Sequence, residues 1–185
     1  MLFILLFMPN HSFEFVLLSI YTEVGQQAFG AAVLQRLLDR GENVVAVCGN
    51  PTKPGQADDP LISTARNHGL EVYQPNSWKT PAALEKMKSF QADFCLMAYV
   101  TKYFPPEVAN TPKYGSACFH PSLLPLHRGP SAISWAIAMG RETTGVTIFE
   151  PTEGLDGEFC IYILVLVFWS TIYSNCLVPS DDCHL

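Results

Sequence analysis

The residues best suited to chemistry are a histidine and an aspartate that follow two consecutive predicted strands. His120 ends a predicted strand over 116–120, and the prolines of the loop behind it restrict the backbone and hold the imidazole in place. Asp156 lies in the loop after the next predicted strand, over 144–150. If these strands are adjacent and parallel, the two side chains meet. A carboxylate beside an imidazole favours the protonated ring and fixes its tautomer, so the pair predicts a general acid that works near neutral pH.

A thiol close to His120 leaves a second chemistry open. Cys118 lies two residues before the histidine, and residues i and i+2 of a strand share one face. Cys118 as a nucleophile with His120 as its base is therefore an alternative. The five histidines and six cysteines lack the paired spacing of metal ligands, so we expect no metal.

Short apolar runs alternate with amphipathic segments along the chain, which predicts an α/β, Rossmann-like fold. Such a fold has a mostly parallel sheet with helices on both faces. Ligands bind beyond the carboxyl ends of its strands, which here points to loops 25–30, 100–106, 120–130 and 151–158. The expected strands are 15–21, 43–48, 71–74, 93–99, 116–120 and 144–150, and the expected helices are 29–41, 61–68, 80–90 and 131–139.

The turn after the first predicted strand does not indicate a dinucleotide. It runs from Gly25 to Gly30 without the middle glycine that lets a pyrophosphate approach, and it lacks the Lys-Ser/Thr of a phosphate-binding loop. We therefore expect no NAD in this chain. Phe29 and Gly30 are expected to help dock the first helix on the sheet.

The middle of the chain differs in charge from its ends. All eleven Lys and Arg lie between Arg36 and Arg141, a stretch of net charge +3 in a chain of net charge −6. A weakly basic middle suits an anionic small molecule, and the negative total argues against direct DNA binding.

The apolar run 159–169 is shorter than the ~20 residues of a spanning helix and is more typical of a buried strand, with a membrane segment as the alternative.

A long motif identifies a family resemblance. From His120 the chain reads His-Pro-Ser-Leu-Leu-Pro-Leu-His-Arg-Gly-Pro-Ser-Ala-Ile-Ser-Trp, and Thr-Gly-Val-Thr-Ile-Phe and Gly-Leu-Asp follow. This pattern resembles the folate-dependent formyltransferases, which include methionyl-tRNA formyltransferase and the hydrolase domain of 10-formyltetrahydrofolate dehydrogenase. The resemblance covers residues 25–158. The His-Pro-Ser form is more similar to the dehydrogenase-type branch.

The resemblance implies a formyltransferase-like fold and 10-formyltetrahydrofolate as formyl donor. His120 would protonate N10 of the folate as it leaves, and Asp156 would hold His120 and help with the proton of the nucleophile. Cys118 stands where the family carries an Asn that stabilises the oxyanion, an Asn that dehydrogenase-type domains also lack. The remaining residues implied are Lys102, Tyr103 and Phe104 in the loop that cradles the folate, and Lys102 and Arg128 as partners for its glutamate tail. A role for Arg128 in bracing its own loop is the alternative.

The resemblance also sets the expected domains. Residues 25–158 form the formyltransferase-like domain, with an atypical segment at 1–24 and an apolar tail at 159–185. The family's Thr after Leu-Asp is missing here, and nothing family-like follows Cys160. We therefore expect ends altered by exon joining or by the gene model.

The expected function is transfer or hydrolysis of the formyl group, with water, an aminoacyl-tRNA or another amine as acceptor. Two alternatives stay open: a truncated, catalytically impaired folate-binding remnant, and a membrane-associated product of unknown function. Unpaired cysteines favour the cytoplasm, with mitochondrial or membrane association left open. Self-association through an exposed sheet face is expected if terminal helices are missing.

Overall fold

The computed structural model describes residues 14–20, 27–100, 104–151 and 160–167. Each predicted strand and helix is present in it, and the apolar run 159–169 contains a strand, as expected. The strands are β1 (Glu14–Ile20), β2 (Asn43–Cys48), β3 (Glu71–Tyr73), β4 (Phe94–Val100), β5 (Ser116–His120), β6 (Thr143–Phe149) and β7 (Cys160–Val167). The helices are α2 (Gln27–Asp39), α3 (Pro60–Asn67), α4 (Pro81–Ser89), α5 (Pro106–Ala109) and α6 (Ala132–Ala138), of which the short α5 was not predicted.

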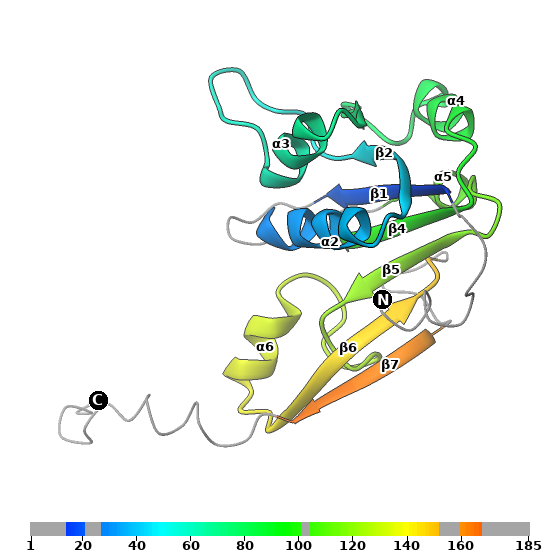
Figure 1. The fold of residues 1–185 in the computed structure, drawn as a ribbon. Coiled ribbons are helices and arrows are strands. Elements are labelled where there is room, and N and C mark those ends of the chain that lie inside the picture. Colours follow the sequence, from blue (N-terminus) through cyan, green and yellow to red (C-terminus); the bar gives the residue numbers. More distant parts are fainter. Residues whose placement is uncertain (1–13, 21–26, 101–103, 152–159, 168–185) are drawn as a thin grey trace.

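The described strands form one sheet in the order β3-β2-β1-β4-β5-β6-β7. β1 to β5 pair in parallel, which confirms a mostly parallel α/β sheet. β6 is antiparallel to both of its neighbours, and Figure 1 shows its arrow (yellow) pointing against that of β5 (green). Since β1 and β7 both lie outside residues 25–158, the sheet extends past the predicted domain limits, and the division of the chain stays a prediction.

Two hydrophobic clusters cover the two faces of the sheet, and β4 contributes to both. Cys95 and Met97 pack in a cluster with side chains of α4 and α5, whereas Leu96 and Ala98 pack in another with side chains of α2 and α3. This alternation follows from the two-residue period of a strand. Helices on both faces are thus confirmed.

Local signals set the starts of α3 and α4, and an aromatic contact supports the position of α2. The Asp59 side chain accepts from Leu61 N at 2.7 Å before α3, and Thr80 Oγ1 accepts from Ala83 N at 3.2 Å before α4, with a proline next in both cases. Such caps satisfy amides that have no partner within the helix. The Phe29 ring of α2 lies 4.6 Å from the Phe119 ring of β5, which supports the predicted docking of this helix.

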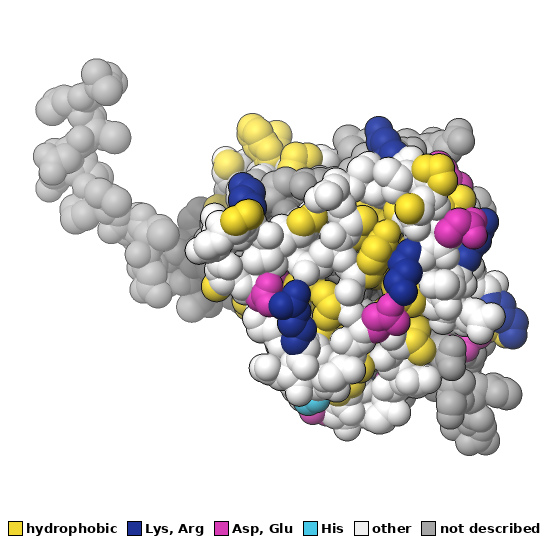
Figure 2. All heavy atoms as spheres, turned by 90° about the horizontal axis from the view of Figure 1, so that it is seen from above, with side chains coloured by type: hydrophobic (Ala, Val, Ile, Leu, Met, Phe, Trp, Pro, Cys, Tyr) yellow, Lys and Arg dark blue, Asp and Glu magenta, His cyan; other side chains and the backbone are white. Residues whose placement is uncertain are grey.

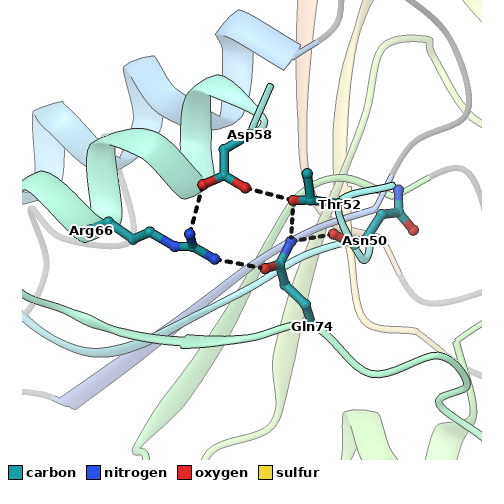
Figure 3. Close-up of polar contacts among 5 residues, drawn as sticks. All are labelled: Asn50, Thr52, Asp58, Arg66 and Gln74. Atoms are coloured by element: carbon teal, nitrogen blue, oxygen red, sulfur yellow. Dashed lines mark hydrogen bonds and ion pairs between the residues drawn. The ribbon is translucent and has the colours of Figure 1, made fainter. Parts of the chain in front are cut away.

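A polar network holds the loop between β2 and α3 (Figure 3). Asp58 accepts a hydrogen bond from Thr52 at 2.6 Å and forms an ion pair with Arg66 at 2.8 Å. Gln74, just after β3, accepts from Arg66 at 3.3 Å and donates to Thr52 at 3.2 Å and to the carbonyl of Asn50. The loop is therefore attached both to α3, into which it leads, and to the segment after β3, which it does not connect.

The surface carries mixed charge. On the face shown in Figure 2, basic and acidic side chains lie near one another and do not gather into a patch of one sign. Within the described ranges, no helix has both the length and the apolar character needed to cross a membrane.

The network predicts that Gln74→Ala loosens the loop over 50–58. The variant loses three side-chain hydrogen bonds, and because the site is partly exposed we expect a cost of about 1 kcal/mol. This corresponds to a Tm lower by roughly 2–4 °C, with faster amide exchange confined to the loop. Gln35→Ala, which removes one exposed contact within α2, is the matched control. Equal exchange in the loop of both variants would contradict the assignment.

The buried thiols of the core predict a loss of stability at alkaline pH. Burial raises the pKa of Cys95 to about 12, and burial together with the nearby Cys95 raises that of Cys48 well above its usual value. In the unfolded chain a thiol titrates near ~8.5, so above that pH the unfolded state releases protons that the folded state keeps. Stability is therefore full below that pH and is lost as the pH rises towards 12.

Urea midpoints measured from pH 7.5 to 10.5 check this expectation. The midpoint should fall above about pH 8.5, and Cys95→Ala should have a shallower fall from a lower starting stability. A midpoint that stays level across the range would refute the assignment.

Candidate active site

His120 lies at the carboxyl end of β5 in a largely buried position. Along β5 the residues alternate between buried and half-buried, and Ser116, Cys118 and His120 are the buried set. Cys118 and His120 therefore share one face, as predicted, and both are 6% exposed. The His120 ring meets Phe149 of β6 edge-on, at 6.5 Å between centroids. A histidine so enclosed has a restricted set of ring orientations.

The relation expected between β5 and β6 is wrong in one respect. The strands are adjacent but antiparallel, with Cys118 opposite Phe149 and His120 opposite Thr147. The end of β6 therefore lies beside the middle of β5, and the two strands do not share a carboxyl edge. The connection over residues 121–142 contains the loop and the short helix α6, and it returns the chain to the sheet close to the end of β5, so β6 runs in the reverse direction.

The imidazole of His120 has one nitrogen bound to the backbone. Its Nε2 lies 3.0 Å from the carbonyl oxygen of His127. A carbonyl oxygen only accepts, so Nε2 carries the hydrogen and donates it. In the neutral ring, Nδ1 is then the nitrogen without a proton. Nδ1 is accordingly where this ring gains or releases a proton while it keeps the bond to His127.

The loop over 121–131 brings the His127 carbonyl to this position. Thr147 Oγ1 donates to the carbonyl of Ser122 at 2.7 Å and accepts from Leu124 N at 3.1 Å. Ser122 Oγ donates to the carbonyl of Leu126 at 2.6 Å. His127 has a φ of 53°, in the left-handed region that non-glycine residues seldom adopt. Side-chain hydroxyls thus fix a loop that the backbone alone would not favour.

His127 lies on this loop and is partly enclosed. Its side chain is half-buried, and its Nε2 is the one buried side-chain nitrogen or oxygen in the described part of the chain without a hydrogen-bond partner. Its backbone carbonyl is the group that contacts His120. The sequence motif names this residue but does not indicate which of its atoms matters.

The other predicted site residues differ in placement. Phe104 is 7% exposed and packs against Trp78 with 4.9 Å between ring centroids, so it belongs to the core, and its contact with a pterin ring stays a prediction. Arg128 is exposed and takes part in none of the ion pairs found among the described residues. Its role as a partner for an anionic ligand stays a prediction. Asp156, Lys102 and Tyr103 lie outside the described residues.

Sequence reasoning missed the two hydroxyl groups that hold the loop. Ser122 and Thr147 are each 0% exposed. A buried hydroxyl is costly unless it is hydrogen-bonded, so a Thr at an inward position of β6 and a Ser after a Pro were signals that could have been noticed. In the same described ranges, no three His, Cys, Asp or Glu residues come together in a way that could hold a metal ion.

The geometry agrees with comparisons to known proteins. A family model described as formyl transferase matches residues 19–165. The cytosolic 10-formyltetrahydrofolate dehydrogenase of Xenopus tropicalis is 39% identical over 167 residues, which is 85% of this chain and 18% of that protein. The methionyl-tRNA formyltransferase of Geotalea uraniireducens (strain Rf4) is 36% identical over 138 residues, covering 72% of this chain and 44% of that protein.

A solved structure shows the same fold. The phosphoribosylglycinamide formyltransferase from Bacillus halodurans superposes with a TM-score of 0.66 at 21% identity, covering 86% of each chain. The chain spans less than half the length of the dehydrogenase and of the methionyl-tRNA formyltransferase that it matches. The match to the family model nevertheless includes β5, β6 and the loop between them. This chain belongs to the formyl transferase family.

Proposed function

We propose that this domain binds 10-formyltetrahydrofolate and releases its formyl group, with His120 as general acid and Asp156 as the partner of His120. The observation that carries the proposal is the buried His120 ring, whose Nε2 is fixed to the His127 carbonyl. From this contact we infer that Nδ1 is the nitrogen that exchanges the proton. Family membership and the 39% identity to a 10-formyltetrahydrofolate dehydrogenase support the choice of donor.

The proposed reaction is an acyl transfer with one critical proton. The nucleophile attacks the formyl carbon, and the bond from that carbon to N10 breaks. N10 takes a proton from Nδ1 of protonated His120, and the nucleophile gives up a proton that Asp156 helps to accept. No electrons are transferred, so this reaction does not call for NAD.

Cys118 determines how well the oxyanion is stabilised. A thiol is a weak hydrogen-bond donor, and losing one good donor to an oxyanion costs about 3–4 kcal/mol in other acyl-transfer enzymes. Sγ of Cys118 lies 3.9 Å from the Phe119 carbonyl, a contact within its own strand. Because the dehydrogenase-type domains that this chain resembles also lack the Asn at this position, we propose the hydrolase branch, with water as acceptor. The amine of an aminoacyl-tRNA is the second candidate, supported by the similarity to a methionyl-tRNA formyltransferase.

A second reading is a folate-binding domain with impaired catalysis. The weak donor at Cys118 favours it. Binding without turnover would identify it: tetrahydrofolate would quench the protein's tryptophan fluorescence, while 10-formyltetrahydrofolate incubated with the protein would stay intact.

Among locations we propose the cytoplasm, and the relatives include cytosolic and mitochondrial proteins.

His120→Ala should abolish release of formate from 10-formyltetrahydrofolate. General acid catalysis contributes about 10²–10⁴-fold, and we expect a loss in that range because N10 leaves poorly without a proton. Asp156→Asn should also lower turnover strongly, since it removes the charge that supports the imidazolium. The measurement is the absorbance change on formation of tetrahydrofolate, with folding checked by circular dichroism.

Two substitutions at Cys118 separate the mechanisms. Cys118→Ala should leave turnover nearly unchanged, and Cys118→Asn should raise it by restoring an oxyanion donor. A thiol nucleophile requires the opposite result. If Cys118→Ala abolishes turnover while His120→Ala stays active, the proposed mechanism is wrong.

We propose that self-association involves α6. The predicted surface was an exposed sheet face, yet the large exposed apolar side chains among the described residues gather mainly on and beside this helix. Trp135 is 58% exposed, Ile137 61% and Met139 58%. Apolar groups this exposed favour association because burying them releases water.

Trp135→Gln combined with Ile137→Gln should therefore shift the protein towards the monomer. Light scattering coupled to size exclusion, run across a tenfold range of protein concentration, measures the change. Tyr114→Gln, which alters an exposed ring away from α6, serves as the control. An unchanged mass for the double variant would rule out α6 as the surface.

A further inference from the structure

Two hydroxyl groups outside the proposed acid–base pair hold the loop that contacts His120. Thr147 lies directly opposite His120 on the neighbouring strand, and Ser122 lies two residues after His120. Both are 0% exposed. A buried hydroxyl that lost its partners would destabilise the folded state, so these groups and the loop constrain each other.

Thr147 fixes the first half of the loop. Its single hydroxyl donates to the Ser122 carbonyl at 2.7 Å and accepts from Leu124 N at 3.1 Å. These two bonds connect β6 to the backbone that follows His120. The start of the loop is thereby tied to the strand that pairs with His120, and Leu124 packs into the core cluster.

Ser122 fixes the second half. Its hydroxyl donates to the Leu126 carbonyl at 2.6 Å, and Leu126 N donates to the Leu123 carbonyl at 2.8 Å. The bond at the Leu126 carbonyl sets the plane of the peptide between Leu126 and His127. With this plane set and φ of His127 at 53°, the next carbonyl points to His120.

We propose that Ser122 and Thr147 are positioning residues that hold His120 in its Nε2–H tautomer by placing the His127 carbonyl. The chain of contacts runs from the Thr147 hydroxyl to Ser122, from the Ser122 hydroxyl to Leu126, and from the His127 carbonyl to the ring. The nitrogen that exchanges a proton is then always Nδ1. The assignment of the tautomer concerns the free protein, and only its catalytic meaning rests on the proposed function.

Nitrogen-15 NMR of protein labelled at histidine tests this inference without substrate. In the neutral ring at alkaline pH, Nε2 of His120 should have a pyrrole-like shift and Nδ1 a pyridine-like shift. His120→Gln assigns the signals by their loss. A wild-type ring in the Nδ1–H tautomer, or in an even mixture, would overturn the proposal before any further variant is made.

The variants test the roles of the two hydroxyls. Thr147→Val keeps the shape and removes the hydroxyl, and Ser122→Ala breaks the chain of contacts at a different bond. Each should give averaged shifts at the two nitrogens, from interconverting tautomers. Thr147→Ser restores the hydroxyl and should behave as wild type, as should the control Thr143→Val at an exposed site on the same strand. A single Nε2–H tautomer in either folded hydroxyl-free variant would overturn the proposal.

Kinetics supply the readout that separates this inference from the proposed function. If the domain turns over 10-formyltetrahydrofolate, Thr147→Val should lower kcat about 10-fold or more with KM nearly unchanged, since only the orientation of the acid changes. Thr147→Ser should recover most of the rate. An equal fall in Thr143→Val, or a loss confined to KM, would argue against positioning. If no variant shows turnover, the proposed function fails while the tautomer measurement still decides the inference.

Discussion

The need to pair the buried hydroxyl of Thr147 organises this part of the molecule. The Thr147 hydroxyl is fully enclosed between β5, β6 and the loop that follows β5, and it has one donor and one acceptor partner there. Both partners are backbone groups of the loop. If the loop left the sheet, the Thr147 hydroxyl would lose both hydrogen bonds, which would cost free energy of folding. The orientation of the His120 ring follows from this constraint, because its Nε2 bonds to the last carbonyl that the constraint positions.

The reversed strand β6 explains why this arrangement exists. An antiparallel neighbour places Thr147 opposite His120, and Phe149 near the His120 ring and opposite Cys118. A parallel neighbour would have entered from the other end of the sheet, and Thr147 would not then pair with His120 in this register. The short helix and the reversed strand together keep β5, the loop and β6 within one small region. This region is where the family motif is densest.

Much of the fold could be predicted from the sequence because its signals are local. Buried apolar runs predicted β2, β4 and β5, and Thr80 with Pro81 predicted the start of α4. The direction of β6 could not be predicted, since a connection over residues 121–142 is long enough for either a parallel or an antiparallel neighbour. At the site, the period of a strand predicted that Cys118 and His120 share a face. The contact between His120 and His127 involves a backbone carbonyl, and no side-chain pattern reports its direction.

The reactivity of the two buried thiols on β2 and β4 can report how often α4 and α5 separate from the sheet. Cys48 and Cys95 are fully buried on the face of the sheet covered by α4 and α5. A small alkylating reagent reaches them only in molecules where that layer has separated from the strands. The labelling rate of these cysteines under native conditions therefore reports the free energy of that separation, in the same way that amide exchange does for a single backbone group.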